Sequence, residues 1–174
     1  MIYADNAATT KMNTAAADAM RSCMEQAWGN PSSLYGLGQR AAEVLQDARE
    51  RIAACIGASC KEITFTSGGS EADNQAIRSA ALLGAQRGKR HIISTAFEHH
   101  AVMHTLKRLE GEGFEVELLP VGGLGTVTAG QVAAAIREDT ALVTVMYANN
   151  EIGSILPIPE IGAACRERGV LFHT

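Results

Sequence analysis

Val143-Thr144-Val145-Met146 is a short, uninterrupted run of apolar and β-branched residues, typical of a buried central strand in a parallel sheet. Further strands are expected at about residues 62–66, 90–95, 115–119 and 170–173, and Val170-Leu171-Phe172 is also expected to be central. Helical patterns follow these strands at about residues 70–87, 100–112, 129–138 and 158–168. This alternation predicts an α/β fold with a mostly parallel sheet flanked by helices.

Two more helices are expected near the N-terminus. Thr14 to Ala27 is rich in Ala and Met, and Gly38 to Ile56 carries apolar residues at spacings of three and four before Gly57.

The helical cysteines lie beside apolar residues and are expected to be buried, reduced thiols: Cys23, Cys55 and Cys165. No linker or repeat interrupts the chain, so we expect residues 1–174 to form a single domain.

Composition narrows the class of protein. A chain of 174 residues with 47% hydrophobic and 20% charged residues is typical of a folded protein with one sizeable core. The formal net charge of -4 and the lack of a Lys/Arg cluster argue against nucleic acid as a partner. No apolar stretch is long enough to cross a membrane, and the N-terminus lacks the features of a signal peptide, so we expect a cytoplasmic protein.

The Gly-rich turn Phe65-Thr66-Ser67-Gly68-Gly69-Ser70-Glu71 lies between an expected strand and an expected helix. Backbone N–H groups at such a helix N-terminus attract phosphate, so Gly69 and Ser70 are candidate phosphate ligands. The turn has neither the Walker pattern nor the dinucleotide fingerprint. A purely structural turn, with Ser70 as the N-cap, is the alternative.

Two other expected strands also end in polar residues. Glu98-His99-His100 follows the strand at 90–95, and Asn149-Asn150-Glu151 follows the strand that contains Val143. His99 could simply cap a helix, and Asn-Asn is common in turns. His100 and His104 have a metal-ligand spacing, but only one carboxylate is near, so no metal is expected. Because parallel strands end at one edge of a sheet, the three polar segments predict one shared site.

Taken in order, these segments resemble the N-terminal half of a NifS/IscS-type cysteine desulfurase, a pyridoxal 5'-phosphate (PLP) enzyme of fold type I and class V aminotransferase-like sequence. The resemblance covers essentially all 174 residues. It implies that the chain is the N-terminal portion of the large PLP-binding domain. The segments that carry it are Asp5–Thr10, Gly29–Ser33, Phe65–Asn74, Glu98-His99 and Asn149–Gly153.

The resemblance also implies roles for individual residues. Gly69 and Ser70 would bind the cofactor phosphate. His99 would stack on the pyridine ring and move protons, which makes it the candidate catalytic residue. Asn150 would donate a hydrogen bond to the phenolic oxygen of PLP, and Asp5–Thr10 would line the substrate mouth.

The chain departs from the family pattern in two ways. Tyr35 stands where the family commonly has a histidine. The family's aspartate for the pyridinium nitrogen is expected directly after Thr174, and its cofactor-binding lysine and nucleophilic cysteine later still. None of the lysines present has the family's context: Lys11, Lys61, Lys89 and Lys107. We therefore expect a fragment that is inactive alone.

For the parent protein, the resemblance implies conversion of L-cysteine to L-alanine, with the sulfur left as a persulfide on a cysteine. It also implies a homodimer and a sulfur-acceptor protein as partners. Another class V PLP enzyme, such as a selenocysteine lyase or an aminotransferase, is an alternative. A non-catalytic domain that needs a partner to supply the lysine is another. Iron–sulfur cluster assembly, tRNA thiolation and cysteine catabolism all stay open as pathways.

Overall fold

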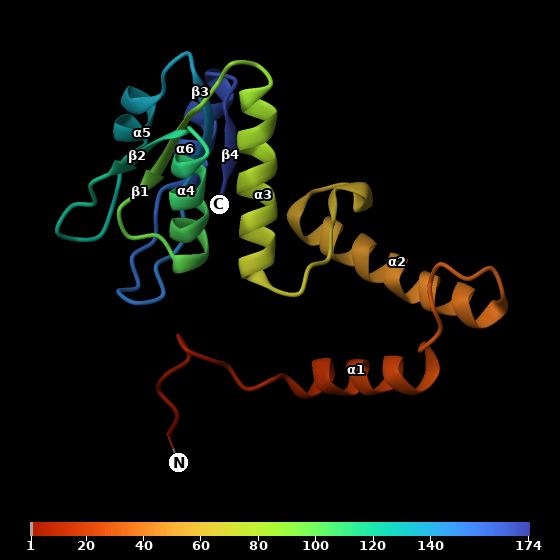
Figure 1. Ribbon diagram of the computed structural model, residues 1–174. Coiled ribbons are helices and arrows are strands. Elements are labelled where there is room, and N and C mark those ends of the chain that lie inside the picture. Colours follow the sequence, from red (N-terminus) through yellow and green to blue (C-terminus); the bar gives the residue numbers. More distant parts are fainter. Residues whose placement is uncertain (1) are drawn as a thin grey trace. The chain divides into compact units, whose positions relative to one another are not determined.

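Four parallel strands form the sheet of the computed structural model, which describes residues 2–174. Their arrangement can be followed in Figure 1. They are β1 (His91–Thr95), β2 (Glu115–Leu119), β3 (Thr140–Thr144) and β4 (Leu171–His173), in the order β2-β1-β3-β4. All three pairings are parallel, with Ile92 opposite both Val116 and Leu142. The α/β class and the parallel sheet are therefore confirmed.

Helices cover both faces of the sheet. Helices α3 (Gly69–Ala85) and α4 (His100–Gly111) pack on one face, against Ile92 and Leu142. Helices α5 (Ala129–Ala135) and α6 (Ile158–Glu167) pack on the other, against Ile93 and Val143. Neighbouring residues of a strand point to opposite faces, so each central strand supplies both cores.

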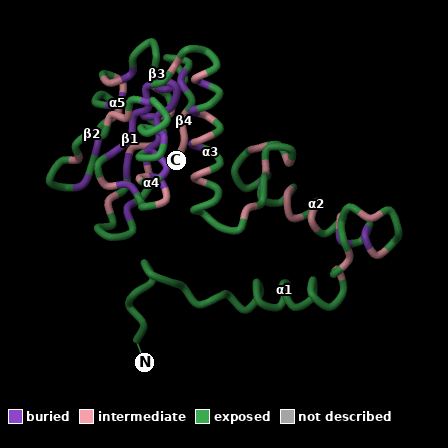
Figure 2. Tube along the Cα trace, in the orientation of Figure 1, coloured by how far each residue is buried: buried purple, intermediate pink, exposed green. Residues whose placement is uncertain are grey.

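Burial is greatest along β1 and β3. Every residue of both strands is buried, and Ile93 and Val143 are 0% exposed. Burying each such side chain stabilises the fold by about 1.5–3 kcal/mol, so these two strands fix the position of whatever follows them. Figure 2 shows this concentration of buried residues in the sheet.

The chain divides into two compact units, one that reaches to Phe65 and one that runs Thr66–Thr174. The sheet belongs to the second unit, as do Gly69, Ser70, His99 and Asn150. The first contains α1 (Thr14–Gln26), α2 (Gly36–Ile56) and the short 3-10 helix η1 (Cys60–Glu62). Whether both units form one domain stays a prediction. Within residues 2–174, no helix has both the length and the apolar character required to cross a membrane.

The strand predicted at 62–66 is wrong. Glu62 accepts a hydrogen bond from the Ser59 N–H at 2.7 Å, and the Ser59 hydroxyl accepts one from the Lys61 N–H at 3.4 Å, so the chain turns into η1 instead. Ile63 follows in an extended conformation, but this segment pairs with no strand within residues 2–174. An apolar alternation this short does not determine whether a partner strand exists.

Two predictions of burial are also wrong. Strand β4 is an edge strand that pairs only with β3 among the described residues, and Leu171 is exposed. Cys23 and Cys55 are exposed, because no residue of α1 is buried and Cys55 lies on the open side of α2. Cys165 is buried as predicted, and burial raises the pKa of its thiol to about 11.

Candidate functional site

The polar turns after β1 and β3 lie next to each other because these two strands are neighbours in the sheet. From β1 the chain continues through α4 to β2 on one side, whereas from β3 it continues through α6 to β4 on the other. Such a reversal in winding direction opens a crevice at the carboxyl ends of the strands, where α/β proteins usually bind ligands. His99 and Asn150 lie on its two sides.

The Gly-rich turn forms the N-terminus of α3. Ser70 is the second residue of the helix and not its N-cap, a position that Gly68 occupies. The predicted cap is wrong because the Glu71 carboxylate reaches back to the Ser67 N–H and hydroxyl, both at 2.6 Å, so the helix starts earlier. These hydrogen bonds lower the pKa of Glu71. The N–H groups of Gly69 and Ser70 donate to no acceptor within residues 2–174.

Asn74 connects the start of α3 to the start of α4. Its side-chain amide donates to the Ser70 carbonyl oxygen at 2.7 Å and to the Ala101 carbonyl oxygen at 3.5 Å. Its Oδ1 accepts from the Thr105 hydroxyl at 2.6 Å. The anion-attracting helix end is thus held against the helix that begins directly after His99.

His99 is the N-cap of α4. Its Nδ1 accepts a hydrogen bond from the Ala101 N–H at 3.2 Å. In a neutral imidazole one nitrogen accepts and the other carries the proton, so this cap places the proton of His99 on Nε2. The capping alternative weighed from the sequence therefore holds, and it leaves the exposed edge of the ring available to a ligand.

The two adjacent asparagines have different surroundings. Asn149 is buried, its Oδ1 accepts from the N–H groups of Glu151 and Ile152 at 2.8 and 3.1 Å, and its Nδ2 donates to the Phe97 carbonyl oxygen at 3.1 Å. Asn150 is exposed, and its side chain donates to the neighbouring Glu151 carboxylate, at 3.2 Å, and to no other group within residues 2–174. Asn149 therefore holds the turn, and Asn150 is free to contact a ligand.

Glu98 is a buried carboxylate at the centre of the site, 8% exposed. Its Oε1 accepts from the Thr95 hydroxyl at 2.7 Å and from the Met146 N–H at 2.9 Å. Burial raises the pKa of Glu98, against the effect of these two hydrogen bonds. Glu98 belongs to the Glu98-His99 segment, but no role was predicted for it from the sequence.

Two small cavities meet at His99. One, of about 90 Å³, is lined by His99 and Asn150 together with Glu98 and Met146. The other, of about 150 Å³, joins His99 to Asp73 of α3. The structure thus brings His99 and Asn150 together. Gly69 and Ser70 line neither cavity but lie one helical turn before Asp73.

His173 and Thr144 complete the second cavity and were missed in the sequence. The Thr144 hydroxyl lies 2.8 Å from His173 Nδ1, and Asp73 Oδ1 lies 3.6 Å from its Nε2. Burial lowers the pKa of His173, while the Asp73 charge acts in the opposite direction. The available signal was the same as for His99, a histidine at the end of an apolar strand.

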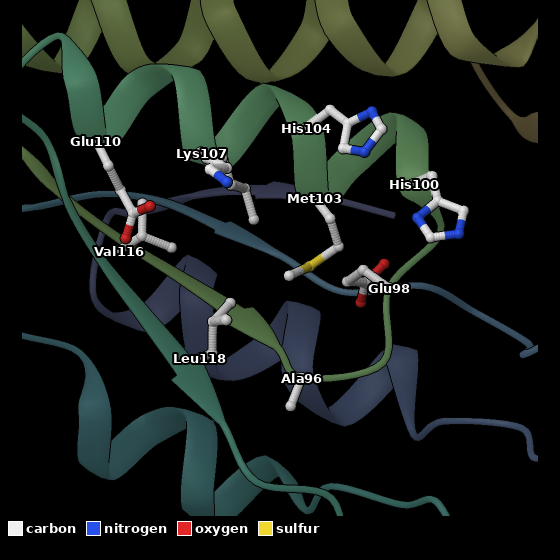
Figure 3. A pocket seen from close by; sticks show the side chains of 10 residues that line it. Ala96, Glu98, His100, Met103, His104, Lys107, Glu110, Val116 and Leu118 are labelled. Carbon is white, nitrogen blue, oxygen red and sulfur yellow. The ribbon is translucent and has the colours of Figure 1, made fainter.

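A larger cavity, of about 420 Å³, lies between α4 and the edge strand β2 (Figure 3). His100 and His104, which have metal-ligand spacing, line it together with Met103 and Leu118, and none of the predicted cofactor ligands does. Within residues 2–174, no group of three or more His, Cys, Asp or Glu side chains has the geometry to hold a metal ion.

The segments Asp5–Thr10 and Gly29–Ser33 belong to the first unit. Both are mostly exposed, and Tyr35 is the N-cap of α2. The predicted position of Asp5–Thr10 at a substrate mouth stays a prediction.

Comparisons with known proteins identify the family of this chain. Residues 2–174 match the model of the family described as aminotransferase class-V. The chain is 47% identical over 173 residues to the cysteine desulfurase IscS of Methanosarcina thermophila, and 49% identical to a putative cysteine desulfurase IscS 1 of Bacillus subtilis. Each alignment covers 99% of this chain but only 43% and 45% of the relative.

Among solved structures, the chain is similar to SspA in complex with cysteine, with a TM-score of 0.93 at 37% identity, covering 99% of this chain and 49% of that one. The chain thus spans less than half the length of the curated relatives it matches. Since the family model extends over every residue that the structure describes, this chain belongs to the class-V aminotransferase family.

Proposed function

We propose that the parent of this chain is a PLP-dependent cysteine desulfurase and that residues 66–174 supply the phosphate and ring contacts of its cofactor site. The observation that carries the proposal is the meeting of His99 and Asn150 in one cavity at the β1–β3 crevice. The names of the relatives, cysteine desulfurases at 47% and 49% identity, support the choice of reaction.

The donors present suit a phosphorylated pyridine. The N–H groups of Gly69 and Ser70 lie at the N-terminus of α3 without an acceptor in the described chain, and the Ser70 hydroxyl adds a third donor. A helix end of this kind binds a dianionic phosphate through hydrogen bonds and through the helix dipole. An imidazole and a carboxamide beside a small cavity match an aromatic ring that carries one oxygen substituent.

Each residue would have a distinct task. Gly69 and Ser70 would hold the phosphate, and Asn74 keeps their helix against α4. His99 would cover one face of the ring and present the proton of Nε2, since its Nδ1 is engaged by the Ala101 N–H. Asn150 would donate to the phenolic oxygen. PLP, when bound, supplies the electron sink that such chemistry needs.

The proposed reaction moves one sulfur atom. The Cβ–S bond of L-cysteine breaks, and the sulfur passes to a thiol of the enzyme, which becomes a persulfide. Cβ gains a proton, and L-alanine leaves. Neither sulfur acceptor nor nucleophile is assigned to a residue of this chain.

The test is turnover by the full-length parent. With PLP and L-cysteine it should release one alanine for each sulfide recovered after reduction, and L-selenocysteine should be compared as the alternative substrate. A parent that binds PLP but forms no alanine from cysteine would show that another class V reaction is correct. The 174-residue chain should form no alanine, because none of its four lysines has the family's context.

We infer that the parent is a cytoplasmic homodimer. Large apolar side chains of the first unit are exposed, including Met24 at 67% and Trp28 at 69%, and such surfaces usually pack against something. Light scattering of the parent at micromolar concentration should give twice the monomer mass. A stable monomer would contradict the dimer and leave the proposed cofactor contacts untouched.

A further inference from the structure

Glu98 joins the ends of two strands that are far apart in the sequence. One oxygen, Oε1, accepts from the Thr95 hydroxyl, at the end of β1, and from the Met146 N–H, two residues after β3. The donors are separated from Glu98 by 3 and 48 residues. A single carboxylate oxygen thus fixes the turn that carries His99 to the turn that carries Asn150.

Asn149 provides a second connection between the same two turns. Its Nδ2 donates to the Phe97 carbonyl oxygen, and its Oδ1 holds the N–H groups of Glu151 and Ile152. In each turn, a buried residue that makes structural hydrogen bonds directly precedes an exposed residue that is free to bind. Glu98 precedes His99, and Asn149 precedes Asn150.

The width of the gap between His99 and Asn150 therefore depends on these hydrogen bonds. Truncation of Glu98 would leave the Thr95 hydroxyl and the Met146 N–H without their acceptor. The turns would then be free to separate. A displacement of about 1 Å at a binding constellation can cost as much as roughly 100-fold in function, so a small change in this gap matters.

Burying a charged carboxylate costs free energy. The two hydrogen bonds that Glu98 accepts, from the Thr95 hydroxyl and the Met146 N–H, need an acceptor oxygen but no charge. A glutamine offers the same Oε1 acceptor without the charge. If Glu98 acts by positioning the two turns, Glu98→Gln should preserve ligand binding, whereas Glu98→Ala should not.

We propose that Glu98 is a positioning residue whose bridge between Thr95 and Met146 sets the spacing of His99 and Asn150 for an aromatic, phosphorylated ligand. This rests on the proposed function, because the ligand is taken from it. Glu98 also lines the larger cavity between α4 and β2, but the proposal does not involve that cavity.

The experiment uses the 174-residue chain and two probes, pyridoxine 5'-phosphate and inorganic phosphate. Pyridoxine 5'-phosphate has the ring and phosphate but no aldehyde, so it cannot react with lysines. NMR titration should follow the backbone amides of Gly69 and Ser70 and the side chains of His99 and Asn150. The wild-type chain should bind pyridoxine 5'-phosphate more tightly than phosphate.

Glu98→Ala should weaken pyridoxine 5'-phosphate binding about tenfold and leave phosphate binding unchanged, an estimate that assumes a displacement of a few tenths of an ångström. Glu98→Gln should bind within about twofold of wild type, since one acceptor oxygen replaces another. Thr95→Val replaces the hydroxyl that donates to Glu98 with a methyl group and should show a smaller loss in the same direction, which keeps the test valid if Glu98→Ala does not fold.

Thr140→Val is the matched control. Thr140 is also a buried threonine with a hydrogen-bonded hydroxyl, but it lies at the opposite end of β3, near His91 and the Arg137 N–H. This variant should keep wild-type affinity for both probes, which would show that a lost buried hydroxyl is not enough to impair binding.

Two failures are distinguishable. If the wild-type chain binds pyridoxine 5'-phosphate no more tightly than phosphate, the proposed cofactor site is wrong and the positioning role falls with it. If the wild-type chain prefers pyridoxine 5'-phosphate and Glu98→Ala keeps that preference, the positioning role alone is overturned. An equal loss in Thr140→Val would overturn it as well.

Discussion

Replacing either of two adjacent asparagines by alanine should have very different effects on stability. The buried Asn149 side chain makes three hydrogen bonds to backbone groups, two from its own turn and one to the Phe97 carbonyl oxygen, and a weaker one to the Met146 sulfur at 3.5 Å. At about 1 kcal/mol for each net hydrogen bond, Asn149→Ala should lower the free energy of unfolding by about 3 kcal/mol. Asn150 is exposed, so Asn150→Ala should change it by less than about 0.5 kcal/mol.

Native-state hydrogen exchange at the Val143 amide, in the buried strand β3, measures this difference. A loss of about 3 kcal/mol corresponds to exchange that is roughly 100-fold faster. Pyridoxine 5'-phosphate binding should weaken in both variants at equal fractions of folded protein, because Asn150→Ala removes a proposed ligand contact and Asn149→Ala removes a connection between the two turns. Equal changes in exchange for the two variants would refute the division of roles between these residues.

Three further outcomes follow from the structure. Burial raises the pKa of Glu98 above its ordinary 4.5, so the folded chain holds this proton longer than the unfolded chain, and stability should fall as pH rises above 4.5. Urea unfolding should show that slope disappear in Glu98→Gln, and an unchanged slope would contradict it. Burial lowers the pKa of His173 below 6.5, so its share of stability should be present above 6.5 and lost as pH falls through the lowered pKa. NMR titration of the ring with a midpoint at or above 6.5 would be inconsistent with this. Finally, Gly84→Ala would place a Cβ against the Cβ of Ala141 and 3.2 Å from its Cα, at an expected cost of about 1–3 kcal/mol, whereas Gly111→Ala, in open space, should cost nothing in the same unfolding measurement.

The order of the elements was predictable because their periodicity is local. Strands β1 and β2 and helices α3 and α4 were expected within one or two residues of their observed bounds. Each contains enough apolar residues at the right spacing to identify its type without knowledge of its neighbours.

The predictions that were wrong depend on neighbouring strands and side chains, which a local sequence pattern does not specify. Ile63 to Thr66 has the composition of a strand but no partner within residues 2–174. Val170-Leu171-Phe172 has the composition of a central strand, but among the described residues it pairs on one side only. Ser70 was predicted to be the N-cap. Because the Glu71 carboxylate accepts a hydrogen bond from the Ser67 N–H, the helix begins at Gly69 instead.

The site was predicted in part. The alternation of elements predicted His99 and Asn150 at the same edge of one sheet, and the structure brings them into one cavity. That their strands are direct neighbours was not predicted. The residues that hold them there were not predicted. Glu98 and Asn149 act on turns about 50 residues away, and no local pattern indicates such a contact. The assignments of Gly69, Ser70, His99 and Asn150 to a cofactor stay predictions.

The adjacency of β1 and β3 determines when the site can exist during folding. The contacts of Asn74 with Ala101 and Thr105 span 27 and 31 residues and lie wholly upstream of β2. The contacts that add Asn150 span 48 and 52 residues, and closing a loop of that length costs about 2 kcal/mol more than closing one of five residues. On a ribosome that adds about 5–20 residues per second, the turn after β3 emerges roughly 3–10 s after the His99 turn. The helix end and the imidazole are therefore made first, and the last turn completes the crevice only when β3 pairs with β1.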